Sequence, residues 1–86
     1  MGKYQISLAR SASKELHALD RQIVHRILPK IEALATEPRP GGCRKLQGEE
    51  NLWRIRIGDY RIIYSIDDRL RVVDIKSIRH RRDAYR

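Results

Sequence analysis

The sequence predicts an α+β domain in which two helices pack on one face of a small, mostly antiparallel four-stranded sheet. Apolar and polar residues alternate near the N-terminus and again through much of the C-terminal half, with the period of two that is typical of strands. Between these regions, apolar residues recur at three- and four-residue steps, as in helices that lie on a core. A chain of 86 residues is enough for one domain, so we expect residues 1–86 to form a single unit.

The first strand and the first helix are predicted from the N-terminal residues. Lys3 to Leu8 alternates apolar and polar side chains, which indicates a strand with one buried face. Ser11 or Ser13 follows, and serine is favoured at the N-cap, where its hydroxyl accepts a hydrogen bond from a free backbone N–H. We therefore expect a short helix to begin at one of these serines.

The second helix is predicted to be longer and to begin after Asp20. Its apolar stripe runs from Ile23 to Ala35 at helical spacing. Pro29 lies inside this stripe and removes one helical hydrogen bond. Because the periodicity continues past the proline, we expect one kinked helix. The Pro- and Gly-rich stretch from Glu37 then begins a loop that is predicted to reach about Asn51.

The C-terminal half is predicted to form three antiparallel strands. The segments Leu52–Ile57 and Tyr60–Ile66 flank Gly58-Asp59, a two-residue turn that fixes the register of a hairpin. A second turn at Asp67–Leu70 leads to a last strand over about Arg71–Ile78. The order is therefore strand, helix, helix and three strands, which is typical of helices packed on one face of a sheet.

Arginines gather on one face of the predicted hairpin. With the two-residue turn, Arg56 lies opposite Arg61 and Arg54 lies opposite Ile63, on the face away from the core. Like charges directly across a ladder are destabilising, and a merely solvated face would normally mix both signs. We therefore interpret the three arginines as a site that receives an anion such as phosphate.

The net charge also favours an anionic partner. The chain has 19 Lys and Arg against 11 Asp and Glu, a formal charge of +8, which suits nucleic acid, an anionic membrane or an acidic protein. The C-terminal segment adds cations around His80 and Tyr85. Histidine ordinarily titrates near neutrality, whereas tyrosine can stack on a base or lose a proton among cations.

Several classes of protein and site do not fit the sequence. It contains no apolar run long enough to span a membrane, and MGKYQISLARS lacks the apolar segment of a signal peptide. No metal-ligand spacing, Gly-rich phosphate loop or Ser-His-Asp set is present. Cys43 is the single cysteine, which suits a reduced thiol. We expect a cytoplasmic protein without a metal or cofactor.

Two C-terminal segments carry a recognisable joint pattern, KLQGEENLWRIRIGDYRIIYSIDD at 45–68 and VVDIKSIRHRRDAYR at 72–86. Together they resemble the RelE/ParE superfamily of toxins from bacterial type II toxin–antitoxin modules. The resemblance implies a small sheet flanked by helices. For RelE-type members it implies metal-independent endoribonuclease activity against messenger RNA in the ribosomal A site, in which the ribose 2′-hydroxyl attacks the adjacent phosphate.

The resemblance also implies roles for four arginines. Arg54 and Arg56 match positions where well-studied RelE proteins carry lysines, and Arg61 and Arg81 match arginines. Arginine is effectively never deprotonated in proteins, so Arg54 and Arg56 are expected to act by electrostatic stabilisation. Arg61 is expected to hold the scissile phosphate, and Arg81 to hold it or to serve the leaving oxygen.

A C-terminal tyrosine of the family pattern matches Tyr85, which is the expected general base. His80 is the alternative base. Four further cations are expected to contact RNA: Lys45, Lys76, Arg79 and Arg82.

Two other functions remain open from the sequence. One is a ParE-type toxin that inhibits DNA gyrase without nuclease activity, and the other is an RNA-binding module that does not cut. Both toxin types imply a cognate antitoxin, whose acidic segments would suit the +8 chain, and the RelE type also implies the ribosome and messenger RNA. Contact with operator DNA is expected only through the antitoxin, because the chain shows no helix-turn-helix signal.

Overall fold

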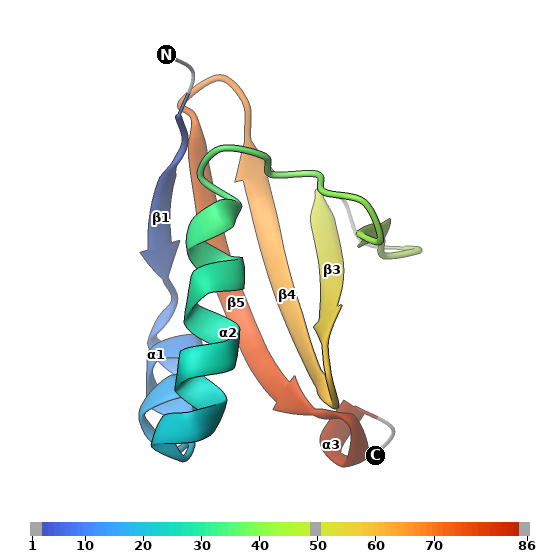
Figure 1. Ribbon diagram of the computed structural model, residues 1–86. Coiled ribbons are helices and arrows are strands. Elements are labelled where there is room, and N and C mark those ends of the chain that lie inside the picture. The colour runs from blue at the N-terminus through green and yellow to red at the C-terminus, as the bar shows by residue number, and fades with distance from the viewer. Residues whose placement is uncertain (1–2, 49–50, 85–86) are drawn as a thin grey trace.

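The computed structural model describes residues 3–48 and 51–84, and side chains as far as residue 82. Its two layers are a twisted sheet and the helices α1 and α2, which pack on one face of that sheet (Figure 1). The strands lie in the order β1-β5-β4-β3-β2. The elements are β1 (Gln5–Leu8), α1 (Arg10–His17), α2 (Arg21–Ala33), β2 (Arg44–Lys45), β3 (Leu52–Ile57), β4 (Tyr60–Asp67), β5 (Val72–His80) and α3 (Arg81–Ala84).

The α+β class and the helix-covered face are confirmed, whereas the expected number of four strands was one too few. The additional strand is β2, two residues inside the segment expected to be a loop. It pairs antiparallel with β3, while β1 at the opposite edge runs parallel to β5. A four-residue helix, α3, also follows β5 directly, and so short a helix has no periodicity that the sequence could reveal.

The hairpin of β3 and β4 has the predicted register. Arg56 pairs with Arg61, Arg54 with Ile63, and the turn residue Gly58 has a positive φ of 60°. Glycine adopts this conformation without the steric cost that a side chain would bring. The alternation of side chains therefore separates an isoleucine-rich face from an arginine-rich face, as the sequence predicted.

The expected serine cap of α1 was wrong. The N-cap residue is Ala9, which has extended backbone angles and donates its N–H to the Ile75 carbonyl at 2.8 Å. Because this bond extends the pairing of β1 up to the first helical residue, the helix begins at Arg10 and Ser11 lies inside it. The Ser11 hydroxyl instead donates to the Lys76 carbonyl at 3.0 Å.

Helix α2 begins where it was predicted to begin. Asp20 is its N-cap residue, and the Asp20 carbonyl accepts the Val24 N–H at 3.0 Å. The helix continues through Pro29 to Ala33 as a single element. Within the described residues, no helix is both long and apolar enough to cross a membrane.

The core lies between the helices and the covered face of the sheet. The buried apolar residues are Ala12, Ile27, Ile31, Leu34, Ile55, Ile62, Tyr64, Ile66, Val73, Ile75 and Ile78. Tyr64 is fully buried and donates its hydroxyl to the Pro38 carbonyl at 2.8 Å, and burial raises the pKa of Tyr64. This bond fastens the loop after α2 to the central strand.

A β-bulge in β5 decides which side chains of that strand reach each face. Ile63 pairs with Ser77 and Tyr64 pairs with Ile75, so Lys76 is the extra residue. In a regular strand, side chains three residues apart point to opposite faces. The extra residue shifts this alternation by one position, so Ile75 and Ile78 are both buried in the core. The same shift places Arg79 opposite Arg61 in the register.

A polar cluster joins three segments at the end of the sheet opposite α3. Arg39 binds both carboxylate oxygens of Asp68, at 3.2 and 2.9 Å, and lies 5.0 Å from the centre of the Trp53 ring. The Tyr4 hydroxyl donates to Asp68 at 2.6 Å. The hydrogen bonds from Arg39 and Tyr4 lower the pKa of Asp68. Asp68 therefore ties the N-terminal strand and the loop after α2 to the β4–β5 turn.

We expect Asp68→Asn to lower the free energy of unfolding near pH 7, because Arg39 loses its charged partner. A carboxylate whose pKa is lower in the folded state contributes stability above its unfolded pKa, and loses it as the pH falls through the folded pKa. The difference between the two proteins should therefore shrink below about pH 4. Urea unfolding at several pH values measures it, with the N-cap substitution Asp20→Asn as control. An equal difference at pH 7 and pH 3 would contradict the role of the charge.

Candidate anion-binding site

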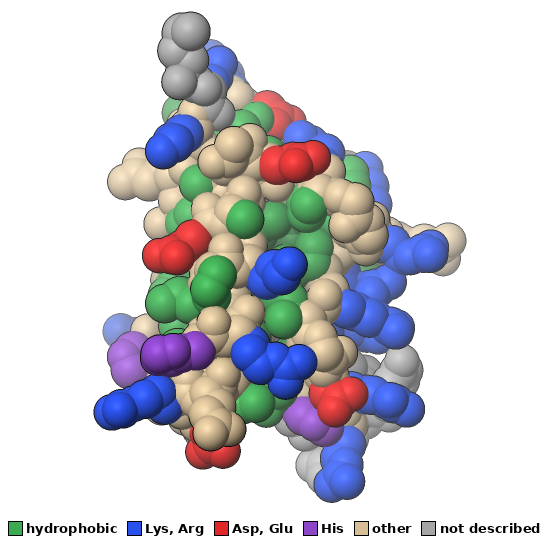
Figure 2. All heavy atoms as spheres, viewed as in Figure 1, with side chains coloured by type: hydrophobic (Ala, Val, Ile, Leu, Met, Phe, Trp, Pro, Cys, Tyr) green, Lys and Arg blue, Asp and Glu red, His purple; other side chains and the backbone are tan. Residues whose placement is uncertain are grey.

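The strand register places three arginines in one row of the sheet, although the side chain of Arg79 reaches Glu15 of α1. The register places Arg56 of β3 beside Arg61 of β4, and Arg61 beside Arg79 of β5. This row is the one nearest α3. Lys and Arg side chains gather along the β3 side of the molecule and at the end near α3 (Figure 2). The predicted pairing of Arg56 with Arg61 is therefore confirmed by the register.

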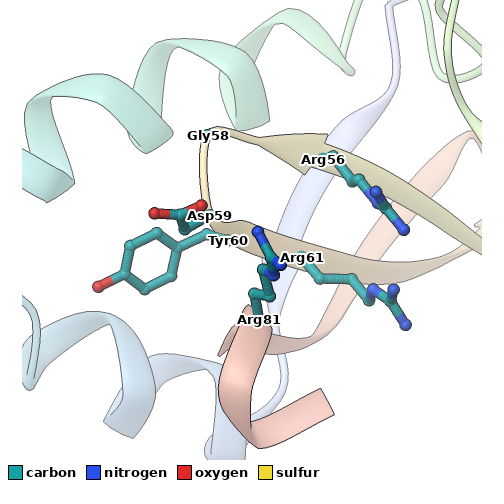
Figure 3. A pocket seen from close by; sticks show the side chains of 6 residues that line it. All are labelled: Arg56, Gly58, Asp59, Tyr60, Arg61 and Arg81. Atoms are coloured by element: carbon teal, nitrogen blue, oxygen red, sulfur yellow. The ribbon is translucent and has the colours of Figure 1, made fainter. Parts of the chain in front are cut away.

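A pocket of about 270 Å³ lies where this row meets α3. Its lining residues are Arg56, Gly58, Asp59, Tyr60, Arg61 and Arg81. Figure 3 shows Arg56 and Arg61 extending to the same side of the hairpin, with Arg81 reaching from α3 toward Arg61. The Asp59 carboxylate and the Tyr60 ring turn the other way. Three arginines therefore line the pocket, and the Asp59 side chain extends away from those of Arg56 and Arg61.

The hairpin turn holds the pocket together. The Arg81 N–H donates to the Asp59 carbonyl at 2.6 Å, which fixes the start of α3 to the turn. Across the turn, Nη2 of Arg26 lies 3.0 Å from the point that a Cβ atom would occupy on Gly58. The positive φ therefore favours glycine at position 58, and a larger residue would also have to shift the Arg26 side chain slightly.

A second hollow continues the cationic surface along β3. Its volume is about 550 Å³, and Arg44, Arg54 and Arg56 line it together with Gly41 and Gly42. Arg44 pairs in register with Arg54, so β2 brings a further arginine onto the face. Arg56 lines both hollows, which makes the surface continuous. Arg44 was not among the residues predicted from the sequence; its position beside Lys45 in a basic pair was the available signal.

His80 lies at the end of β5, in register with Tyr60. The two rings are in edge-to-face contact, with centres 5.2 Å apart. Nδ1 of His80 accepts the Arg82 N–H at 3.2 Å, which leaves Nε2 for any other role. His80, Arg81 and Arg82 line a neighbouring hollow of about 780 Å³ with Asp59. Tyr85 lies outside the described residues.

Two of the other cations expected to contact RNA form ion pairs within the chain. Nε of Arg79 pairs with Oε2 of Glu15 at 3.3 Å, and Nζ of Lys76 pairs with Oδ2 of Asp74 at 2.8 Å. Burial raises the pKa of Asp74, but hydrogen bonds from Lys76 and Ser7 outweigh it and leave the pKa lowered. The structure therefore gives Arg79 and Lys76 protein partners.

Lys45 of β2 is exposed and lies opposite Trp53 of β3. Because side chains alternate along a strand, Lys45 points to the face opposite that of its neighbour Arg44. Of the two adjacent cations, Arg44 is therefore the one on the arginine face.

The chemistry open to this arrangement is electrostatic. Guanidinium groups offer several fixed N–H donors whose geometry matches phosphate oxygens, and they stay charged at all ordinary pH values. Donors held in place beforehand can also stabilise charge that develops on a phosphate during its transfer. Among the residues that the structure describes, no group of three or more His, Cys, Asp or Glu side chains is arranged to hold a metal ion.

Comparison with known proteins identifies the family. Residues 6–85 match the family described as ParE toxin of type II toxin-antitoxin system, parDE. The chain belongs to the RelE/ParE superfamily of toxins. The family predicted from the two C-terminal segments is thereby confirmed, and the match extends it over the N-terminal strand and helices.

Several relatives are similar in length as well as in sequence. A Methanocaldococcus jannaschii protein assigned as toxin RelE1 is 29% identical over 89 residues, which cover 98% of this chain and 97% of that protein. A chain of the RelE–RelB complex from Pyrococcus horikoshii OT3 is 31% identical, with a TM-score of 0.81 over 92% of this chain and 96% of that one. A chain of the Mycobacterium tuberculosis RelBE2 complex is 28% identical, with a TM-score of 0.80 over 92% and 99%.

We expect the pocket arginines to bind single-stranded oligonucleotide through its phosphates. Arg56→Gln, Arg61→Gln and Arg81→Gln should each weaken binding several-fold and reduce the slope of log K against log salt by about 0.7 for each phosphate that is no longer neutralised. Fluorescence anisotropy at several salt concentrations measures both quantities. Arg69→Gln is the matched control, because Arg69 is exposed in the β4–β5 turn at the opposite end of the sheet. Equally weakened binding in the control would show that only net charge matters.

Proposed function

We propose that this toxin is a ribosome-dependent endoribonuclease that cleaves messenger RNA in the A site and so inhibits translation. The observation that supports the proposal most directly is that Arg56, Arg61 and Arg81 line one pocket, with the Asp59 side chain turned away from Arg56 and Arg61 (Figure 3). An inhibitor that only occupies a protein partner does not need a pocket of this kind. The relatives named RelE agree with this choice.

In the proposed reaction the 2′-oxygen of one ribose attacks the adjacent phosphorus and the 5′-oxygen of the next nucleotide leaves. The products are a 2′,3′-cyclic phosphate and a 5′-hydroxyl. Arg61 and Arg81 hold the phosphate, while Arg54 and Arg56 stabilise the charge that builds on its non-bridging oxygens. The ribosome orients the message, which compensates for the shortage of strong general bases in the chain.

Tyr85 is the proposed base for the 2′-hydroxyl. His80 is the alternative, but its Nδ1 already accepts the Arg82 N–H and its ring packs edge-on against Tyr60. These contacts favour a supporting role for His80 at the start of α3. The proton of the leaving 5′-oxygen is proposed to come from solvent or from the ribosome, since a guanidinium is a very weak acid.

We expect Arg61→Ala and Arg81→Ala each to slow cleavage on programmed ribosomes by about 10²-fold, the usual cost of removing one preorganised donor to a transition state. Primer extension under single-turnover conditions measures the rate and the site of cleavage. Arg69→Ala should cleave at the wild-type rate. Intact message with folded wild-type protein would contradict the proposed function.

The base is tested in the same assay with Tyr85→Phe and His80→Gln. Loss of cleavage with Tyr85→Phe alone supports the assignment of Tyr85. Loss with His80→Gln alone transfers the role to His80, and full activity in both variants assigns it to the ribosome.

Inhibition of DNA gyrase is the second candidate, favoured by the matching family description, which names ParE. A supercoiling assay with purified gyrase separates it from the nuclease. Inhibition of supercoiling by the wild-type protein, together with intact message on ribosomes, would establish the ParE-type function. A chain that binds oligonucleotide but does neither would be a non-cleaving RNA-binding module.

A cognate antitoxin is the proposed partner, as in the RelE–RelB complexes of the relatives. The +8 charge favours an acidic segment that covers the arginine face or displaces α3, and operator DNA is proposed to be contacted through the antitoxin. The toxin is proposed to act in the cytoplasm, where it meets ribosomes. We expect a saturated toxin–antitoxin complex to leave ribosome-bound message intact in the primer-extension assay. Full cleavage by the complex would contradict this mode of neutralisation.

A further inference from the structure

The second half of β5 has a strand on only one side within the described part of the chain. Strand β1 pairs with β5 from Val72 to Ile75 and then ends, whereas β5 continues along β4 to His80. Helix α1 lies beside this unpaired stretch. Its Ser11 hydroxyl donates to the Lys76 carbonyl at 3.0 Å, and Oε1 of Glu15 accepts the Ile78 N–H at 2.8 Å.

These two contacts take the place of the backbone hydrogen bonds that a neighbouring strand would make to this part of β5. Ser11 and Glu15 are four residues apart, so they lie on the same side of α1 and reach successive backbone groups of the β5 edge. A strand edge with free N–H and C=O groups would otherwise be open to pairing with another chain or to fraying. Helix α1 therefore acts as the edge partner of β5 through two side chains.

Glu15 uses its other oxygen for Arg79, but that contact is the weaker of the two. Nε of Arg79 lies 3.3 Å from Oε2, and the side chains of Arg79 and Glu15 are 53% and 27% exposed. Ion pairs that are open to solvent contribute little to stability. A carboxylate that accepts a partly buried backbone N–H makes a strong, charge-assisted hydrogen bond. The main effect of Glu15 is therefore on the backbone at Ile78.

This backbone bond lies close to the pocket along the chain. Ile78 is three residues before Arg81, whose N–H binds the Asp59 carbonyl at 2.6 Å and whose side chain lines the pocket. Between them, His80 forms the last pair of the strand with Tyr60. If the end of β5 separates from α1, the strand that leads into α3 keeps its pairing with β4 but loses its support on the other side.

We propose that Glu15 is a positioning residue of the arginine pocket, which accepts the Ile78 N–H, fixes the end of β5 and so holds Arg81 beside Arg61. Only its consequence for RNA cleavage rests on the proposed function. The placement of Arg81 can be measured without any substrate.

Three substitutions separate the two contacts of Glu15. Glu15→Gln keeps an oxygen that can accept the Ile78 N–H but removes the charge that pairs with Arg79. Glu15→Asp keeps the charge on a side chain one methylene shorter, so the acceptor no longer reaches. Glu15→Ala removes both contacts and retains a strong helix former in α1. Glu32→Gln, an exposed acid of α2, is the control for the change in charge.

The first readout is the hydrogen-exchange rate of the Arg81 amide, measured by NMR relative to that of Ile62 in the core strand β4. Local opening at the end of β5 should speed exchange at Arg81 by about tenfold in Glu15→Ala and Glu15→Asp, with little change at Ile62. Glu15→Gln and Glu32→Gln should stay near the wild-type rate. If Glu15→Ala does not fold, Glu15→Asp supplies the same test. Wild-type exchange at Arg81 in the Ala or Asp variant, or equally fast exchange in Glu15→Gln, would overturn the proposal.

The second readout is a double-mutant cycle with Arg81→Ala, measured as binding of a single-stranded all-2′-deoxy oligonucleotide, which has no 2′-hydroxyl and cannot be cleaved. Glu15→Asp, which leaves the net charge unchanged, should weaken binding by about threefold to tenfold in the wild-type background and have no further effect once Arg81 is absent. Additive effects would overturn positioning through Arg81. Because this cycle involves no cleavage, failure of the ribosome assay with an intact cycle would remove the proposed nuclease function and leave the role of Glu15 standing.

Discussion

The two-residue turn at Gly58-Asp59 is the constraint on which the site depends. It sets the register in which β3 and β4 pair, and a slip by one residue would move every side chain of a strand to the opposite face. Such a slip of β3 would bury Arg56 and expose Ile55, and a slip of β4 would bury Arg61 and expose Ile62. Burying an isoleucine stabilises the fold by about 1.5–3 kcal/mol, whereas like charges across a ladder cost a few tenths to about 1 kcal/mol. The core therefore enforces the crowding of the arginines.

The bulge at Lys76 is the second determinant of the site. Because of the bulge, β5 contributes both Ile75 and Ile78 to the core and also places Arg79 opposite Arg61. The bulge also determines which face each side chain takes at the end of β5. Helix α3 begins at the next residue, Arg81. The pocket thus combines two side chains whose position follows from regular pairing with one whose position follows from an irregularity.

The sequence was sufficient where regular periodicity and turn chemistry agree. The hairpin register, the covered and uncovered faces, the start of α2 and its continuation past Pro29 were all predictable, because each rests on local spacing. Strand β2 was not, because two residues are too few to show a period, and so Arg44 was missed. The partnership of Glu15 with Ile78 and Arg79 was also hidden, since it joins residues more than sixty positions apart.

Gly58 shows how exposure and tolerance to substitution can diverge in this chain. It lies on the surface, where replacement is usually harmless, yet its backbone angle disfavours a side chain and the guanidinium of Arg26 crowds the position. Any larger residue would have to strain the backbone and displace Arg26 at once. A survey of homologous sequences should accordingly find glycine strongly favoured at this solvent-exposed position, for reasons of chain geometry and not of chemistry.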